Sequence, residues 1–215
     1  MLNRRRAGFY ERRFFPWLNE KLVADPDLKK SRAEALAPAR GRVVEIGFGS
    51  GSNLPHYPPP VQSIAAIEPN EGMIDYARPQ IRSSHIPVDL IVGEAESLPF
   101  ADRSFDTAVS TLTLCSVLDP ARALDELRRV LRDDGRLIVL EHGLSPDPNV
   151  ARWQHRLNGL EKIVACGCHL NRPISQLIEH HGFRFDAVRT FYAPKPPRTH
   201  GWVTVGSAVK VQPIT

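Results

Sequence analysis

The stretch VVEIGFGSGSNLPHY, residues 43–57, decides the fold. An apolar run ends in Glu45 and is followed by three glycines at positions 47, 49 and 51. Glycine adopts backbone conformations that other residues avoid, and its lack of a side chain lets a ligand approach the main chain. A buried strand that runs into such a turn predicts a ligand-binding loop at the carboxyl end of that strand.

The spacing of these glycines and the carboxylate before them select the ligand. A dinucleotide-binding loop reads G-x-G-x-x-G, whereas the third glycine here comes one residue early. A pyrophosphate binds exposed amides and would be repelled by the carboxylate of Glu45. Glu45 instead favours a cation, and S-adenosylmethionine carries both an ammonium group and a sulfonium. A tight turn without a ligand is the alternative, and a nicotinamide cofactor is disfavoured.

Apolar runs and helical patterns alternate outward from this loop, which predicts an α/β domain with a mostly parallel sheet. One helix pattern has Asp119 as its cap, Pro120 in its first turn and Asp133, Asp134 and Gly135 at its end. The expected strands are 42–46, 62–67, 88–92, 105–110 and 136–141, and the expected helices between them are 70–78 and 120–132.

The second half of the chain predicts two helices and a closing hairpin. Helices are expected over 150–164 and from Pro173 to Gly182. The strand-like runs 183–192 and 201–211 are close enough to form an antiparallel hairpin at a sheet edge. Three prolines between these runs predict a long turn without regular structure over 193–200.

Residues 2–23 form a basic amphipathic helix pattern. Its apolar face holds Tyr10, Phe14, Trp17, Leu18 and Leu22. Three roles are open for it: a cap over the cofactor, a peripheral contact with a membrane surface, or a dimer contact. The same segment has five arginines, and Pro16 is expected to perturb the helix.

Length and composition predict one domain over 1–215. The motifs divide it into an N-terminal amphipathic helical cap at 1–25, a cofactor-binding half at 40–142 and an acceptor-binding half at 143–215. Three cysteines give no disulfide framework, and no signal peptide or membrane-spanning run is evident. We therefore expect a cytoplasmic protein, with a peripheral position at the inner membrane surface as the alternative. A net charge of +4 does not indicate nucleic-acid binding.

Further motifs carry a family resemblance. Glu68 ends the second apolar run, and GEAESLPFADRSFD, residues 93–106, differs from the family pattern G-D-A-x-x-L-P-F-x-D-x-S-F-D at Glu94. The chain resembles the class I S-adenosylmethionine-dependent methyltransferases from about residue 40 onward. The resemblance implies a Rossmann-like seven-stranded sheet flanked by helices, and S-adenosylmethionine as cofactor. The residues expected to hold the cofactor are Glu45, Gly47, Gly49, Gly51, Asn53, Glu68, Pro69, Glu94, Ala95, Thr111 and Leu112.

The second half resembles one branch of this family. TLTLCSV (111–117), LEHG (140–143) and CGCHLNR (166–172) are similar to small methyltransferase-like thiol methyltransferases and their bacterial relatives. This implies methyl transfer to a small lipophilic acceptor, most simply a thiol, by direct in-line displacement. The alternatives are a phosphatidylethanolamine N-methyltransferase, a quinone-type methyltransferase, and a catalytically silent protein that binds the cofactor for regulation.

Candidate acceptor residues follow the later strands, where ligands of open α/β sheets bind. His142 is the candidate base because the pKa of histidine lies near neutrality. No metal is expected, because the C-x-C-H of Cys166, Cys168 and His169 lacks a partner pair. The residues expected to shape the acceptor pocket are Cys115, Ser116, Trp153, His155, Cys168, His169 and Arg172.

Overall fold

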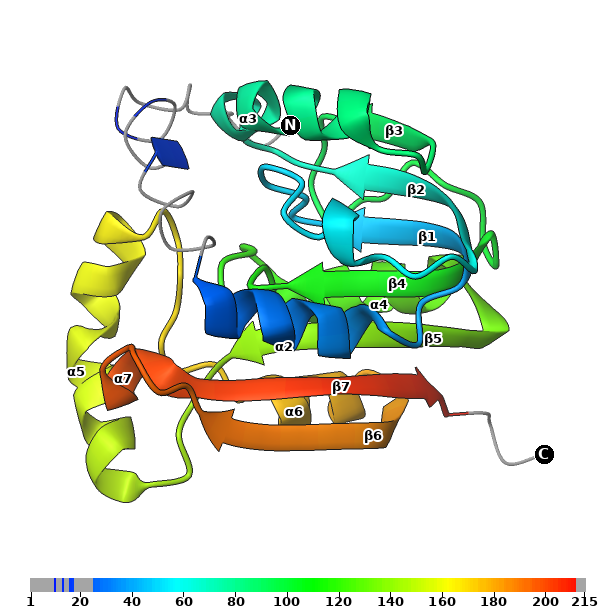
Figure 1. Ribbon diagram of the computed structural model, residues 1–215. Helices are drawn as coiled ribbons and strands as arrows, with labels where there is room; N and C mark the ends of the chain where they lie inside the picture. Colours follow the sequence, from blue (N-terminus) through cyan, green and yellow to red (C-terminus); the bar gives the residue numbers. More distant parts are fainter. Residues whose placement is uncertain (1–9, 11–12, 14–15, 18–24, 212–215) are drawn as a thin grey trace.

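The computed structural model describes residues 10, 13, 16–17 and 25–211. Seven strands form one sheet in the order β3-β2-β1-β4-β5-β7-β6 (Figure 1). Five strands run parallel, and β7 pairs antiparallel with both β5 and β6. This confirms the Rossmann-like sheet with an antiparallel hairpin at one edge. The strands are β1 Gly41–Ile46, β2 Val61–Ile67, β3 Val88–Ile91, β4 Phe105–Thr111, β5 Leu131–His142, β6 Phe183–Tyr192 and β7 Trp202–Lys210.

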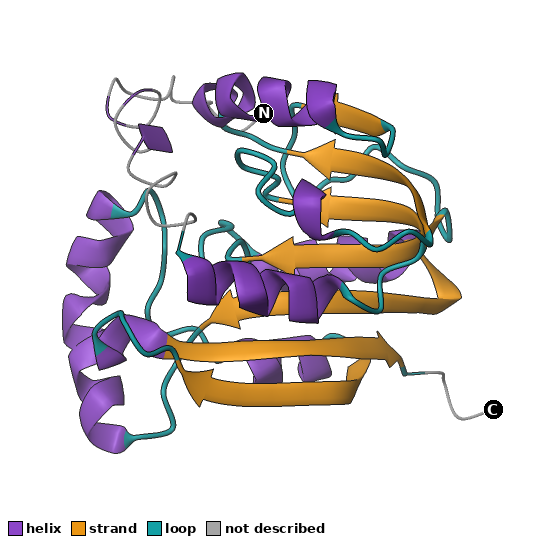
Figure 2. Cartoon of the chain, viewed as in Figure 1, coloured by secondary structure: helices purple, strands orange, loops and turns teal. Residues whose placement is uncertain are grey.

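Helices cover both faces of the sheet (Figure 2). In the view of Figure 1, α2 lies in front of the sheet and α4 and α6 lie behind it, whereas α5 stands at the end toward which the arrowheads of β1 and β5 point. That end is where ligands of open α/β sheets bind. The helices are α2 Pro26–Leu36, the 3₁₀ helix η2 Leu54–His56, α3 Glu71–Ser83, α4 Pro120–Val130, α5 Pro148–Val164, α6 Ile174–His180 and α7 Arg198–Gly201.

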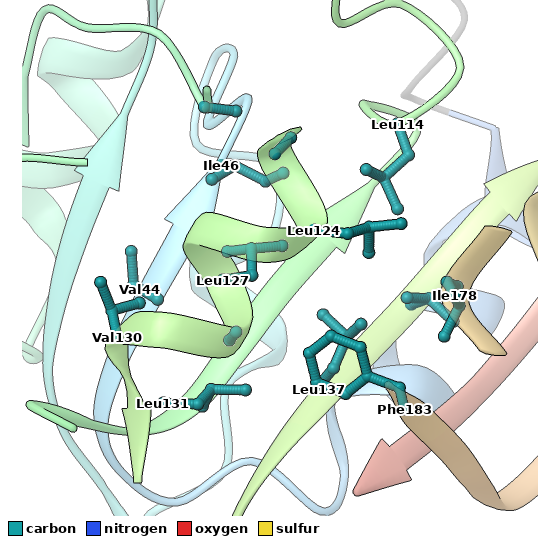
Figure 3. Close-up of a cluster of buried hydrophobic side chains, with 14 of the residues drawn as sticks. Val44, Ile46, Leu114, Leu124, Leu127, Val130, Leu131, Leu137, Ile178 and Phe183 are labelled. Carbon is teal, nitrogen blue, oxygen red and sulfur yellow. The ribbon is translucent and has the colours of Figure 1, made fainter. Parts of the chain in front are cut away.

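Alternate residues of β1 point into two separate apolar layers. Val44 and Ile46 face α4, whose Leu124 and Leu127 are fully buried (Figure 3). Val43 faces the opposite layer. Because side chains alternate along a strand, Glu45 also points toward that second layer, which contains α2. This pattern places a carboxylate under the glycine loop, on the α2 face of the sheet.

Several elements differ from the sequence predictions. The helix expected over 70–78 continues through Pro79 to Ser83. The helix α2 was not expected, although Asp25 caps it through the amides of Asp27 and Leu28. The helix α4 ends at Val130, and Leu131 already pairs with Phe105 in β5. The expected strand start at 136 was therefore too late, because the buried side chain of Leu131 draws the chain into the sheet.

The proline-rich segment before β7 is also more regular than expected. A four-residue helix, α7, occupies Arg198–Gly201. Proline destabilises the interior of a helix but is tolerated before a helix starts, and Pro197 takes that position. The turn predicted over 193–200 therefore contains the start of a helix.

The N-terminal helix predicted over 2–23 lies mostly outside the described residues. Within the described part, the Tyr10 hydroxyl donates a hydrogen bond of 2.6 Å to the carbonyl of Val164 in α5. No helix in the described part of the chain is both long enough and apolar enough to cross a bilayer.

Candidate functional site

The glycine loop after β1 has the conformation that its sequence predicts. Gly47, Gly49 and Gly51 have φ angles of 62°, 60° and 80°, in the left-handed region that favours glycine. At Gly47 there is also no room for a side chain, because an added Cβ would collide with Thr113. The loop therefore presents bare main chain above the end of β1.

Glu45 is held beneath this loop by two side-chain donors. The Tyr57 hydroxyl donates to Oε2 at 2.6 Å, and the Asn53 amide donates to Oε1 at 2.8 Å. The residue is only 2% exposed. Burial raises the pKa of Glu45 to about 7, although both hydrogen bonds and the charge of Arg32 oppose the shift. The carboxylate is thus fixed in position and poorly solvated, which favours an incoming cation.

Asn53 connects this carboxylate to two other elements. Its amide also donates to Thr111 Oγ1 at 3.0 Å, and its carbonyl accepts a hydrogen bond of 2.6 Å from the Arg32 guanidinium of α2. Asn53 therefore positions Glu45. The sequence did not predict the roles of Arg32 and Tyr57. Tyr57 lies in the opening motif, but nothing in its spacing shows that it reaches back to the strand.

A cavity of about 70 Å³ opens beside the glycine loop. It brings together residues from β1, the loop, α2 and the end of β4. Of the predicted cofactor residues, those that line it are Glu45, Gly47, Gly49, Asn53, Thr111 and Leu112.

Glu68, the acid that follows β2, also holds the glycine loop in place. Glu68 Oε2 accepts from the amide of Gly49, and Oε1 accepts from the amide of Asn70, each at 2.8 Å. Burial raises the pKa of Glu68 despite these hydrogen bonds. Glu94 is exposed and Ala95 is buried, and neither lines the cavity. Gly51 and Pro69 do not line it either.

A second group of functional side chains lies at the ends of β4 and β5. His142 Nε2 is 3.0 Å from Cys168 Sγ, and the ligand atoms of Cys115, His142 and Cys168 all lie within 4.8 Å of one another. The adjacent Glu141 is fully buried, and its Oε1 accepts from Ser110 Oγ at 2.7 Å. The structure thus brings the predicted base together with two of the predicted pocket residues.

Close contact changes the acidities of these groups. The hydrogen bond with Cys168 and the charge of His142 lower the pKa of Cys115, although burial opposes them. The same thiol contact and burial raise the pKa of Cys168. Burial would lower the pKa of His142, but the negative charge of Cys115 raises it to about 9. Burial raises the pKa of Glu141 to about 7.

Other predicted pocket residues hold this group in place. The Arg172 guanidinium donates to the carbonyl of Leu114 at 2.5 Å, and the amide of His169 donates to the carbonyl of Cys115 at 2.8 Å. Ser116 Oγ lies 3.4 Å from Cys115 Sγ. These contacts fix the loop after β4 against the segment between α5 and α6.

The two predicted residues on α5 are not members of the group formed by Cys115, His142 and Cys168. Trp153 is 53% exposed and has the Arg156 guanidinium 5.3 Å from its ring centroid, so it is not a core residue. His155 is exposed, and its Nδ1 lies 2.9 Å from the Asn171 amide. A larger cavity of about 280 Å³ lies next to Gly143, and no predicted acceptor residue lines it.

Comparison with known proteins shows that the chain is similar to methyltransferases. The methyltransferase domain family matches residues 44–139. The chain is 30% identical over 207 residues to the thiol S-methyltransferase TMT1B of Homo sapiens, covering 90% of this chain and 82% of that protein. The chain spans 66% of the length of the rat protein of the same name. A demethylmenaquinone methyltransferase of Clavibacter sepedonicus is 32% identical over 119 residues, which cover 55% of this chain and 48% of that protein.

The solved structures lead to the same family. A SAM-dependent methyltransferase of Thermotoga maritima superposes with a TM-score of 0.68 at 27% identity, covering 94% of this chain and 98% of that chain. The cofactor is therefore S-adenosylmethionine, and the protein is an enzyme. By its sheet and its sequence relatives, the chain belongs to the class I S-adenosylmethionine-dependent methyltransferases.

Proposed function

We propose that this methyltransferase acts on a small lipophilic thiol. The observation that carries the proposal is the contact of 3.0 Å between His142 Nε2 and Cys168 Sγ, which engages the predicted base within the protein. A primary ammonium or a ring carbon needs a base to become nucleophilic, whereas a thiol with a pKa of about 8.5 is about 3% thiolate at pH 7. A thiol therefore suits a site that supplies alignment more than proton transfer.

The sequence relatives support the same acceptor. The match to the thiol S-methyltransferase TMT1B covers 90% of this chain, whereas the match to the demethylmenaquinone methyltransferase covers 55%. The longer match extends beyond the cofactor half into the acceptor half, where specificity is expected. A quinol acceptor is the second candidate, because the quinone enzyme is 32% identical over its shorter match.

Within this proposal, Glu45 faces the cationic methionine part of the cofactor and the glycine loop leaves room for it. Their common cavity supports this assignment. Glu68 accepts the ribose hydroxyls, since each of its oxygens has a second lone pair beside its amide donor. Glu94 and the Ala95 amide contact the adenine, as the family resemblance implies. The thiolate then attacks the methyl group in line, and S-adenosylhomocysteine leaves.

The organisation of the chain follows from these roles. One domain over 1–215 has its cofactor half at 40–142 and its acceptor half at 143–215. For residues 1–25 we propose a cap over the cofactor, with a membrane-surface contact through 1–23 or a dimer contact as the alternatives; the membrane contact would suit a lipophilic acceptor.

Measuring S-adenosylhomocysteine formation with alkyl thiols, reduced quinones and phosphatidylethanolamine vesicles tests the proposal. We expect turnover with thiols, and a matched thioether should be inactive because it has no ionisable S–H. Turnover confined to quinols or vesicles would overturn the thiol assignment. Tight cofactor binding without any product would indicate a silent regulatory protein.

A further inference from the structure

Three soft metal ligands converge from separate segments of the chain. Cys115 lies in the loop after β4, His142 ends β5, and Cys168 lies between α5 and α6. Their ligand atoms lie within 4.8 Å of one another, and His142 Nε2 and Cys168 Sγ are 3.0 Å apart. Tetrahedral zinc, with bonds of about 2.0 Å to nitrogen and 2.3 Å to sulfur, needs its ligand atoms about 3.5–3.8 Å apart. The side chains are within a small rotation of that spacing.

The backbone around this cluster is arranged to bring the thiols together. Cys166 and Gly167 both have positive φ angles, 48° and 97°. This turn carries the chain past the loop after β4, so that a Cβ on Gly167 would lie 3.2 Å from the carbonyl of Ser116. On the other side, the amide of His169 bonds to the carbonyl of Cys115. The two cysteines are therefore held face to face by main chain.

Burial and charge also favour a cation here. Cys115 is 2% exposed and Cys168 is 8% exposed, so two neighbouring thiolates would be poorly solvated. Arg172 and Glu141 are buried nearby and carry opposite charges. A divalent cation would balance the charge of two thiolates.

We propose that Cys115, His142 and Cys168 form a Cys₂His site for a soft divalent cation, with Zn²⁺ as the ion that these ligands suit best. The C-x-C-H motif alone does not predict this site. Only its second cysteine takes part, and the remaining ligands come from the ends of β4 and β5.

The fourth coordination position gives the site a role in the reaction, and this step rests on the proposed function. Zinc sites with three protein ligands commonly bind water or substrate in the fourth position. Leu112 lines the cofactor cavity, and Thr113 Oγ1 bonds to the carbonyl of Ile46. Cys115 follows two residues later, so the same loop places the metal on the acceptor side of the cofactor.

The metal would activate the acceptor thiol. The thiol binds as a thiolate, and its proton passes to solvent. Its sulfur forms a bond to the methyl carbon while the sulfonium carbon–sulfur bond breaks, and the bonding pair stays on the sulfur of S-adenosylhomocysteine. The product is a neutral thioether, which is a weaker ligand and leaves the metal. In this scheme His142 is a ligand and not a base.

Metal content tests the site without reference to activity. We expect about one zinc per chain after purification without chelators or metal-affinity resin, measured by plasma mass spectrometry. Cys115→Ser and Cys168→Ser should each reduce zinc at least tenfold, and the matched control Cys166→Ser should retain it. Equal zinc in all three variants, or no zinc in the unaltered protein supplied with zinc, would overturn the proposal.

Cobalt substitution covers the case in which a variant fails to fold. In the unaltered, reduced protein, Co²⁺ should give thiolate-to-cobalt charge-transfer bands and the intense visible bands of a tetrahedral site. Their absence would overturn the proposal, and so would a Cys115–Cys168 disulfide found by thiol counting in protein purified without reductant.

Adding hexane-1-thiol to the cobalt protein separates the two proposals. A shift of the visible bands supports thiol ligation at the fourth position, and an unchanged spectrum contradicts it. Cobalt bands without thiol methylation would leave the metal site standing and remove the proposed acceptor. Thiol methylation by metal-free protein would leave the proposed acceptor standing and overturn the role of the metal in activating it.

Discussion

Glu45 makes cofactor binding dependent on pH. Burial raises the pKa of Glu45 to about 7. The Tyr57 hydroxyl and the charge of Arg32 oppose this shift, whereas the charge of Glu68 adds to it. A cationic ligand needs the ionised carboxylate, so affinity should fall about tenfold per pH unit below about pH 7. Affinity should also decrease above about pH 8, where the α-amino group of the ligand loses its charge. Calorimetric titration of S-adenosylmethionine between pH 5.5 and 8.5 measures this.

The variant Tyr57→Phe tests whether the pKa of Glu45 controls this pH dependence. It removes a hydrogen bond that favours the charged form, so the pH at which affinity begins to fall should rise. Tyr76→Phe, at an exposed position on α3, should leave the pH profile unchanged. An identical profile in both variants would show that Glu45 does not control binding.

The same shift has the opposite consequence for the stability of the free protein. The pKa of Glu45 lies above its ordinary value of 4.5, so the folded state favours the protonated form. The contribution to stability is complete below about pH 4.5 and is lost as pH rises through about 7. We expect the free energy of unfolding to fall by at most about 3 kcal/mol from this group. Urea unfolding of the unaltered protein and of Glu45→Gln, compared across this range, isolates the effect.

Glu68 is expected to contribute directly to cofactor affinity. Glu68→Ala should weaken binding by about 1–3 kcal/mol, or about 5- to 150-fold in Kd, because ribose hydroxyls lose a charged acceptor. Glu179→Ala, exposed on α6, is the control. Because Glu68 also accepts from the Gly49 amide, thermal unfolding should accompany the titration. Unchanged Kd in a folded Glu68→Ala protein would contradict our placement of the ribose.

The site was predictable where local sequence sets the geometry. Glu45 and the glycines follow from strand and turn chemistry, and Glu45, Gly47 and Gly49 line one cavity, whereas Gly51 does not. The support behind Glu45 was not predictable, because Arg32 acts through Asn53 from a helix that precedes β1. The thiol cluster was hidden for the same reason, since its members meet only after the sheet has formed.

The apolar face of α4 should contribute strongly to the stability of the fold. Leu124 is fully buried against the sheet (Figure 3), whereas Leu118, just before the helix, is 84% exposed. Leu124→Ala should lower the free energy of unfolding by about 2–5 kcal/mol through lost contacts and a residual cavity. Leu118→Ala should change it by less than about 0.5 kcal/mol. Chemical denaturation measures both, and equal losses would contradict the packing described.

Helix and strand boundaries show where local signals stop being sufficient. The start of α2 has the same Asp-Pro signal as the start of α4, so Asp25 and Pro26 could have predicted it. The end of α4 had no such signal. Asp133, Asp134 and Gly135 are typical of a helix end, but Leu131 pairs with Phe105 before they are reached. Here tertiary burial outweighs the local preference for a turn.

Gln154 joins three distant parts of the molecule. It is fully buried on α5, accepts from the Ser145 amide at 2.9 Å, and donates to the carbonyls of Gly143 and Thr199 at 3.0 Å each. Gln154→Ala should lower the free energy of unfolding by about 1–3 kcal/mol, because it leaves buried backbone groups unpaired.

The matched control for this change is Gln176→Ala, at an exposed position on α6. It should alter the free energy of unfolding by less than about 0.5 kcal/mol in the same urea titration. A Gln154→Ala protein as stable as this control would show that α5 is held in place by other contacts.

The position of β7 between β5 and β6 sets the order in which the sheet can close. β6 is synthesised first, yet among the described residues its only sheet neighbour is β7, which also covers an edge of β5. A chain interrupted before Trp202 therefore leaves the edge of β5 that β7 covers, Arg136–His142, unpaired, and open edges of this kind recruit strands from other molecules. We expect nascent or proteolysed chains that lack β7 to assemble with one another, so the final strand acts as a safeguard against aggregation.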